Sequence, residues 1–152
     1  MVAPIAIGFD ESKDNLIPSN ARPYIYNCTV LEGSVIEYEG GTACGILGSG
    51  RTVGCVNYAN ITAQHAAGIT HSDWAKDCVN YGKIIGIYYA GGITSGSRCA
   101  YYCTNYGDII SDGLGGAIFG LPHERNDSCQ ENGVNANYGT VTAKHIIPVS
   151  YS

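Results

Sequence analysis

A short pattern of polar, aromatic and apolar positions recurs along the chain and sets its organisation. The frame Cys-x-Asn-Tyr-(Gly/Ala)-x-Ile occupies Cys55–Ile61, Cys78–Ile84 and Cys103–Ile109. A fourth copy, Asn135–Val141, has asparagine in place of the cysteine. The frame asparagines at positions 57, 80, 105 and 137 are 23, 25 and 32 residues apart. The polar stretch from 121 to 133 lies in the longest step, and we interpret it as a loop inserted into one repeat.

A second element alternates in phase with this frame, at Gly45-Ile46, Gly68-Ile69, Gly92-Ile93 and Ala117-Ile118. The repeats are rich in glycine and β-branched residues and show no helical periodicity, so each has room for two or three short strands and no helix. The sequence therefore predicts an all-β chain folded as a short parallel β-solenoid, or β-helix. We expect about 4–5 rungs of roughly 23–27 residues each and an irregular N-terminal cap.

Three segments follow from this pattern. Residues 1–23, with three prolines and a charged run, are expected to form an N-terminal cap or arm. Residues 24–142 carry the solenoid repeats, and Tyr26–Val35 fits the frame as an irregular first rung with one inserted residue. Residues 143–152 are expected to form a C-terminal edge strand or tail, where Pro148 limits further pairing.

Alternation along a strand places the cysteine and asparagine of each frame on the same, inward side. Stacked rungs then bring equivalent residues together as ladders, which we expect to include Cys55, Cys78, Cys103, Asn57, Asn80, Asn105 and Asn137. The asparagines sit at a turn, where each amide can bond the backbone and the amide of the next rung. The glycine that follows the tyrosine is expected to supply a positive φ at this corner.

The Gly-Gly-Ile element followed by Cys-x-Asn-Tyr-Gly-x-Ile resembles the GLUG-type and related glycine-rich Asn-Cys-Tyr repeats of bacterial surface proteins. The resemblance covers residues 41 to 142 and is strongest from Cys78–Ile84 through Gly91–Ile93. It departs at Ala59, where the family has glycine, and at Asn135, where it has cysteine. The resemblance implies an adhesin-like β-solenoid displayed at a cell surface, without catalytic residues that can be transferred.

Charge and composition limit the classes of partner that we expect for this chain. The net charge is −5 and the basic residues are scattered, so we expect no nucleic-acid partner. No apolar run is long enough to span a bilayer, so no membrane insertion is expected. No Cys-x-x-Cys pair occurs, and we predict no metal site and no cofactor. Sequons at Asn27, Asn60 and Asn126 would permit N-glycosylation of an extracellular glycoprotein.

Cys44, Cys99 and Cys129 lie off the predicted ladder, in loops or at strand edges, where disulfide formation is expected in an oxidising compartment. His65, His71 and Asp73 lie close together in the sequence but match no metal-ligand spacing, and we expect a surface turn there. Two carboxylate pairs, Glu37 with Glu39 and Asp108 with Asp112, have the residue types of a glycosidase, and a solvated face is the alternative.

Aromatic and loop residues are the candidate contacts for a glycan or a protein. A row of tyrosines would either stack a partner or pack ring on ring. Trp74 would close a corner or mark a contact, and the inserted loop would project from the scaffold. The candidate contacts are Tyr58, Tyr81, Tyr106, Tyr138, Trp74, His123 and Arg125.

These features favour a non-enzymatic extracellular or cell-surface module for adhesion, display or structure. One alternative is a subunit that assembles into an extracellular filament by end-to-end or lateral packing. Another is a β-helix protein that binds or acts on polysaccharide, which rests on fold analogy alone. The expected partners are accordingly a carbohydrate, a protein surface or a second copy of the chain.

Overall fold

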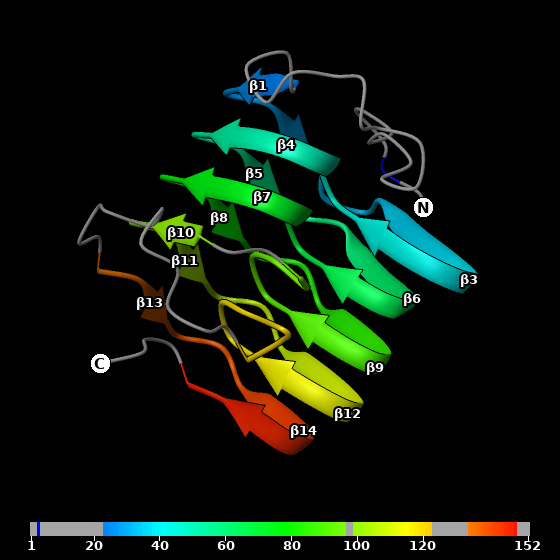
Figure 1. Cartoon of the computed structure of the whole chain (residues 1–152). Coiled ribbons are helices and arrows are strands. Elements are labelled where there is room, and N and C mark those ends of the chain that lie inside the picture. The colour runs from blue at the N-terminus through cyan, green and yellow to red at the C-terminus, as the bar shows by residue number, and fades with distance from the viewer. Residues whose placement is uncertain (1–2, 4–22, 97–98, 123–133, 149–152) are drawn as a thin grey trace, which may run out of the picture.

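The computed structural model describes residues 3, 23–96, 99–122 and 134–148. Over these residues the chain is all-β and winds into a parallel β-solenoid of about four turns, which confirms the fold class expected from the repeats. Figure 1 shows the rungs stacked along one axis, with equivalent strands lying above one another. None of the described segments is a helix long and apolar enough to cross a membrane.

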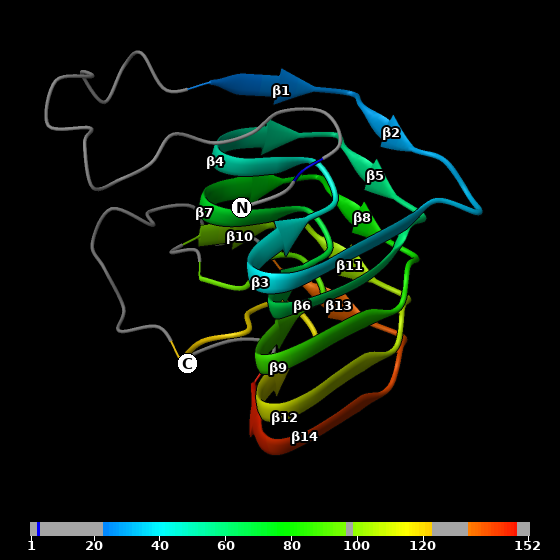
Figure 2. The ribbon, with the colours of Figure 1, turned by 90° about the vertical axis from the view of Figure 1, so that its right-hand side faces the viewer.

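Three parallel sheets form the walls, and the chain visits them in the same order in every full rung (Figure 2). Sheet 1 contains β1 (Tyr24–Tyr26), β4 (Leu47–Val53), β7 (Thr70–Lys76) and β10 (Cys99–Tyr101). Sheet 2 contains β2 (Thr29–Val30), β5 (Val56–Asn57), β8 (Val79–Asn80), β11 (Thr104–Asn105) and β13 (Ala136–Asn137). Sheet 3 contains β3 (Val35–Cys44), β6 (Asn60–Ala67), β9 (Ile84–Gly91), β12 (Ile109–Gly116) and β14 (Val141–Ile147).

The repeat frame corresponds to the corner between sheets 2 and 3. Its asparagine ends the short strand of sheet 2, and Asn80 lies in register with Asn57 and Asn105. The irregular first rung is also in register, but it carries two extra residues at this corner rather than one. Val30 pairs with Asn57 and Val35 with Asn60, so five steps in the first rung match three in the second.

The core consists of apolar side chains stacked from rung to rung. Two isoleucine ladders run through it, Ile46, Ile69, Ile93 and Ile118 in one and Ile36, Ile61, Ile84 and Ile109 in the other, with cysteine and alanine between them. Burying one isoleucine contributes about 1.5–3 kcal/mol, and a rung can collect this only when a neighbouring rung covers it. The stack is therefore the unit of stability.

The two ends differ from the interior. Among the described residues, β14 forms one edge of sheet 3, and the expected boundary between 142 and 143 falls inside this strand. The fifth rung has no described strand in sheet 1, and the expected insertion at 121–133 falls at that place in the chain. Most of the expected cap lies outside the described residues, although Ala3 packs against Cys44 and Ala67.

The prediction that the glycine after the tyrosine has a positive φ is wrong. Left-handed backbone occurs one residue before each frame cysteine instead, with φ of 52° at Asn27, 63° at Gly54, 51° at Asp77 and 52° at Tyr102. Asparagine, aspartate and glycine adopt this conformation at little cost, because the first two bond their own backbone and glycine has no Cβ. The residue that joins sheet 1 to sheet 2 therefore has a left-handed backbone conformation, with positive φ.

The frame glycines are required by close approach of the backbone. A Cβ on Gly82 would collide with the carbonyl oxygen of Ala59, and one on Gly107 would collide with that of Gly82. Ala59 occupies the same position beside the longer corner of the first rung, because Tyr58 N donates to Val30 O and Asn60 N donates to Ser34 O. Each rung thus touches the next through backbone at this corner.

The Gly-Ile element and the asparagine frame meet across the interior. A Cβ on Gly68 would collide with the Asn80 amide group and with the carbonyl oxygen of Gly92. Gly45 lies in the same way against Asn57, and Gly92 against Asn105. Each glycine of the Gly-Ile element packs against one frame asparagine, which explains why the two elements alternate regularly in the sequence.

Candidate binding surfaces

The buried asparagines form a continuous hydrogen-bonded ladder inside the corner. Asn57 Nδ2 donates to Asn80 Oδ1 at 2.8 Å, Asn80 to Asn105 at 2.8 Å and Asn105 to Asn137 at 2.9 Å. The same nitrogen of each asparagine donates to a carbonyl oxygen two residues ahead, as Asn80 does to Gly82 at 2.9 Å. The ladder begins at Asn57, because Val30 occupies the equivalent place in the first rung.

The frame cysteines form a second, inward ladder of free thiols. Cys55, Cys78 and Cys103 are fully buried. The hydrogen bond to Cys103, followed by burial, raises the pKa of Cys78 to about 12, and a hydrogen bond to Cys78 raises the pKa of Cys55. In the fifth rung Asn135 replaces the thiol, and its side chain bonds the backbone at Cys103 N and Ala100 O.

Cys44 differs from the expectation for an oxidisable loop cysteine. It is a free thiol that ends β3 and is fully buried. Burial raises its pKa to about 12, so it stays protonated and unreactive at neutral pH. Cys99 is not among the free thiols, and Cys129 lies outside the described residues.

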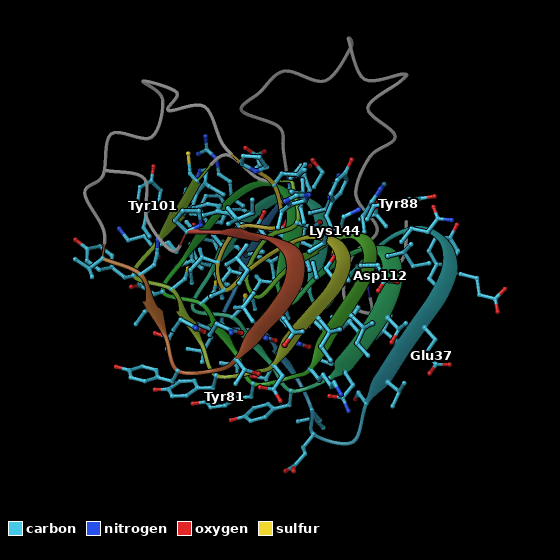
Figure 3. The ribbon with its side chains drawn as sticks, turned by 90° about the horizontal axis from the view of Figure 1, so that it is seen from below. Glu37, Tyr81, Tyr88, Tyr101, Asp112 and Lys144 are labelled. Atoms are coloured by element: carbon cyan, nitrogen blue, oxygen red, sulfur yellow. The ribbon has the colours of Figure 1, made fainter. Side chains whose placement is uncertain are left out.

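The four frame tyrosines stack ring on ring along the outside of the corner, as Figure 3 shows around Tyr81. Ring centroids are 4.7 Å apart for Tyr58 and Tyr81, 4.9 Å for Tyr81 and Tyr106, and 5.0 Å for Tyr106 and Tyr138. The first two pairs are within 5° of parallel. We call these four residues the tyrosine stack.

Because the rings of the tyrosine stack cover one another, only some parts of each ring are accessible to a ligand. The faces of the inner rings are covered by neighbouring rings, so mainly ring edges and hydroxyl groups face solvent. Tyr58 and Tyr138 each have one stacking neighbour in the row, and Tyr138 is the more exposed of the two, at 70% compared with 38% for Tyr58. The stack therefore provides little flat aromatic surface for a sugar except at its last ring.

A second aromatic surface lies on the outer side of sheet 1, and Trp74 is the one candidate contact residue on it that the sequence pattern indicates. Register places Tyr24, Arg51 and Trp74 side by side on β1, β4 and β7. One residue pair further along, Tyr26, Val53, Lys76 and Tyr101 form a parallel row. We call Tyr24, Tyr26, Arg51, Trp74, Lys76 and Tyr101 the aromatic–basic face.

The aromatic–basic face is held together by ring and cation contacts. The Arg51 guanidinium carbon lies 5.4 Å from the Trp74 ring centroid and 6.0 Å from that of Tyr24. Tyr24 meets Trp74 edge-on at 5.7 Å and stacks on Tyr26 at 4.3 Å. The 23-residue spacing of Arg51 and Trp74 is the sequence signal that could have found this pairing.

Of the candidate carboxylates, Asp108 accepts hydrogen bonds from the next rung. Thr140 donates to Asp108 from its hydroxyl group at 2.6 Å and from its backbone nitrogen at 3.2 Å. These hydrogen bonds lower the pKa of Asp108, so this carboxyl group stays ionised at neutral pH. Glu37, Glu39 and Asp112 are exposed on the outer side of sheet 3, where Figure 3 labels Glu37 and Asp112.

The candidate histidines lie on strands rather than in a surface turn. His65 is on β6, within 3.4 Å of the Thr42 hydroxyl group and stacked on Tyr89, and burial lowers its pKa. His71 is on β7, where its Nδ1 lies 2.8 Å from the Ser95 hydroxyl group. Among the described residues, no three His, Cys, Asp or Glu side chains are grouped as metal ligands.

Of the sequon asparagines, Asn27 and Asn60 are exposed, and Asn60 Oδ1 accepts a hydrogen bond from Lys83 N at 2.9 Å. Asn126, His123 and Arg125 lie outside the described residues. Comparison with protein-family models, with curated proteins and with solved structures found no significant match. The assignment to a class therefore rests on the fold alone, that of a parallel β-solenoid.

Proposed function

We propose that the protein is a non-enzymatic extracellular or cell-surface module that serves adhesion, display or structure. The observation that carries this proposal is the aromatic–basic face, on which the Arg51 guanidinium and the rings of Tyr24 and Tyr26 are exposed on a laddered scaffold. Tyrosine, tryptophan and arginine are the residue types that most often dominate binding surfaces. The resemblance to glycine-rich repeats of bacterial surface proteins points to the same kind of role.

Rigidity supports this role. The asparagine ladder, the tyrosine stack and the isoleucine ladders each run through successive rungs. A side chain that projects from such a scaffold loses little backbone freedom when it binds, which is how pre-organised surfaces gain affinity. Exposed Asn27 and Asn60 are also compatible with glycosylation in a secretory pathway.

The proposal is tested on intact cells that produce the protein. A membrane-impermeant amine-reactive biotin should label the protein before lysis, whereas a cytosolic marker should be labelled only afterwards. Labelling only after lysis would contradict the location. Purified protein should bind immobilised polysaccharide or cell-wall material without releasing sugar, and release of reducing ends would contradict the non-enzymatic role.

A self-assembling filament subunit is a second candidate, favoured by the fifth rung. There Val134 is 80% exposed, Tyr138 70% and Ile146 63%, and β13 and β14 have no further described strand beside them. Unpaired edges of this kind are templates for added strands. The first rung matches them poorly, because it has Val30 and Leu31 where the ladders have asparagine and tyrosine.

Light scattering and electron microscopy at rising protein concentration test this candidate. A filament subunit should lengthen with concentration, and Tyr138→Lys should suppress growth, whereas Tyr81→Lys, in the middle of the same stack, should not. Particles that remain monomeric at every concentration would rule the candidate out.

A further inference from the structure

We propose that the aromatic–basic face binds a carboxylate-bearing polysaccharide, with Arg51 as the residue that recognises the carboxylate. This inference deepens the proposed function by naming a ligand class for one surface. It starts from the state of the Arg51 side chain. Arg51 is exposed and lies over two aromatic rings, and among the described residues its guanidinium has no carboxylate partner.

Aromatic contact leaves the guanidinium ready for an anion. A guanidinium stacked on rings keeps its N–H edge available, and that edge matches the two oxygens of a carboxylate. The contacts with Tyr24 and Trp74 also fix a flexible side chain in advance, so less rotamer entropy is lost on binding.

Cations and acids are separated on this face. The chain has a net charge of −5, yet the two outward rows of sheet 1 contain Arg51 and Lys76 and no acidic residue. Asp73 and Asp77 flank these rows at positions with positive φ and are the nearest acids in the sequence. The acids therefore lie at the margins of the two rows, and Arg51 is the exposed cation within them that suits an anionic ligand.

The shape of the face favours a sugar chain over an acidic peptide. Tyr24 and Tyr26 are 38% and 57% exposed, and Trp74 is half-buried, so aromatic carbon lies beside the guanidinium. Apolar C–H faces of a pyranose ring pack on such carbon, whereas glutamate side chains offer little to it. Tyr24, Arg51 and Trp74 occupy three consecutive rungs, about 4.8 Å apart, so the site spans roughly 10 Å. This length suits an oligomer.

Trp74 makes the site directly observable, because it is the single tryptophan of the chain. Titration of the full chain with trigalacturonic acid should change tryptophan fluorescence and saturate. The methyl-esterified trimer, which has the same rings without charge, should bind about tenfold more weakly or worse, as expected for loss of a charged hydrogen bond. Galacturonic acid monomer should also bind more weakly than the trimer.

Variants locate the interaction. Arg51→Gln should weaken trimer binding by about tenfold, whereas Lys144→Gln, which removes an equal charge from the exposed side of sheet 3, should leave it within about twofold. Circular dichroism establishes that both variants are folded. Where Arg51→Gln is unfolded, the ester comparison on the unaltered chain decides.

Four outcomes would overturn the proposal. They are no fluorescence change at millimolar trimer, equal binding of acid and ester, equal loss in the two variants, and equal or tighter binding of a hexaglutamate peptide. None of them bears on the labelling of intact cells, so failure here and failure of the proposed function are distinguishable.

Discussion

At the scale of single residues, the ladder asparagines carry the most interactions per side chain. Asn80 accepts from Asn57 and donates to both Gly82 O and Asn105 Oδ1, while Gly68 lies against its amide group. It is fully buried, so none of these groups can turn to water if the amide is removed. A buried polar group that loses its partner costs about 1–3 kcal/mol.

Asn80→Ala should therefore lower the free energy of unfolding by about 3 kcal/mol or more. Asn137→Ala should cost less, because Asn137 is half-buried and ends the described ladder. Urea unfolding followed by circular dichroism measures both values. Equal losses at the two positions would show that the ladder is not cooperative.

The raised pKa of Cys44 leads us to expect that the free energy of unfolding decreases at alkaline pH. Burial raises its pKa from 9.0 to about 12, so above pH 9 the unfolded state releases a proton that the folded state retains. The contribution of this thiol to the free energy of unfolding is fully present below pH 9. Between pH 9 and about 12 it should fall by about 1.4 kcal/mol per pH unit.

Urea unfolding at several pH values from 8 to 11 measures this slope. Cys44→Ala is the matched control, since tyrosines and lysines titrate in both proteins and only the Cys44 contribution is lost. A variant with the same pH slope as the unaltered chain would contradict the assignment.

At the scale of elements, each corner has a distinct cause. The corner before sheet 2 needs left-handed backbone, and the corner after it needs glycine because a neighbouring carbonyl oxygen lies too close for a Cβ. The sequence pattern predicted that glycine belongs at the second corner but assigned the wrong reason. The backbones of neighbouring rungs approach each other only when the rungs stack. The sequence of a single repeat does not show this contact.

The tyrosine stack makes a prediction at this scale. Tyr81 stacks on two rings and Tyr138 on one. A stacked aromatic pair adds about 0.5–1.5 kcal/mol beyond area burial, so Tyr81→Ala should cost about 1 kcal/mol more than Tyr138→Ala. Urea unfolding of the two variants measures both losses of stability. A larger loss for Tyr138→Ala would contradict the stabilising role of ring stacking.

At the scale of the whole molecule, stability should vary along the axis. A solenoid gains most of its stability from contacts between neighbouring rungs, and an end rung has one neighbour instead of two. Amide hydrogen exchange should therefore be slowest in β8 and β9 and faster in β13 and β14. Uniform protection from end to end would indicate a single cooperative unit.

Sequence periodicity was sufficient for the fold class because the frame repeats with nearly constant spacing through Cys55, Cys78 and Cys103. It was insufficient for the aromatic–basic face. Tyr24, Arg51 and Trp74 are different residue types at equivalent positions, so no repeat motif links them. Only the register of stacked strands brings them together.

The constancy of the corner between Asn57 and Asn105 has a consequence for how such a chain lengthens. The layers that contain Asn80 and Asn105 present the same donor, ring and glycine to the layer on either side. A tandem duplication of residues 81–105 would thus insert one more layer and leave both termini unaltered. We expect that longer protein to be folded and more resistant to urea, because the duplication adds an interface without creating a new end.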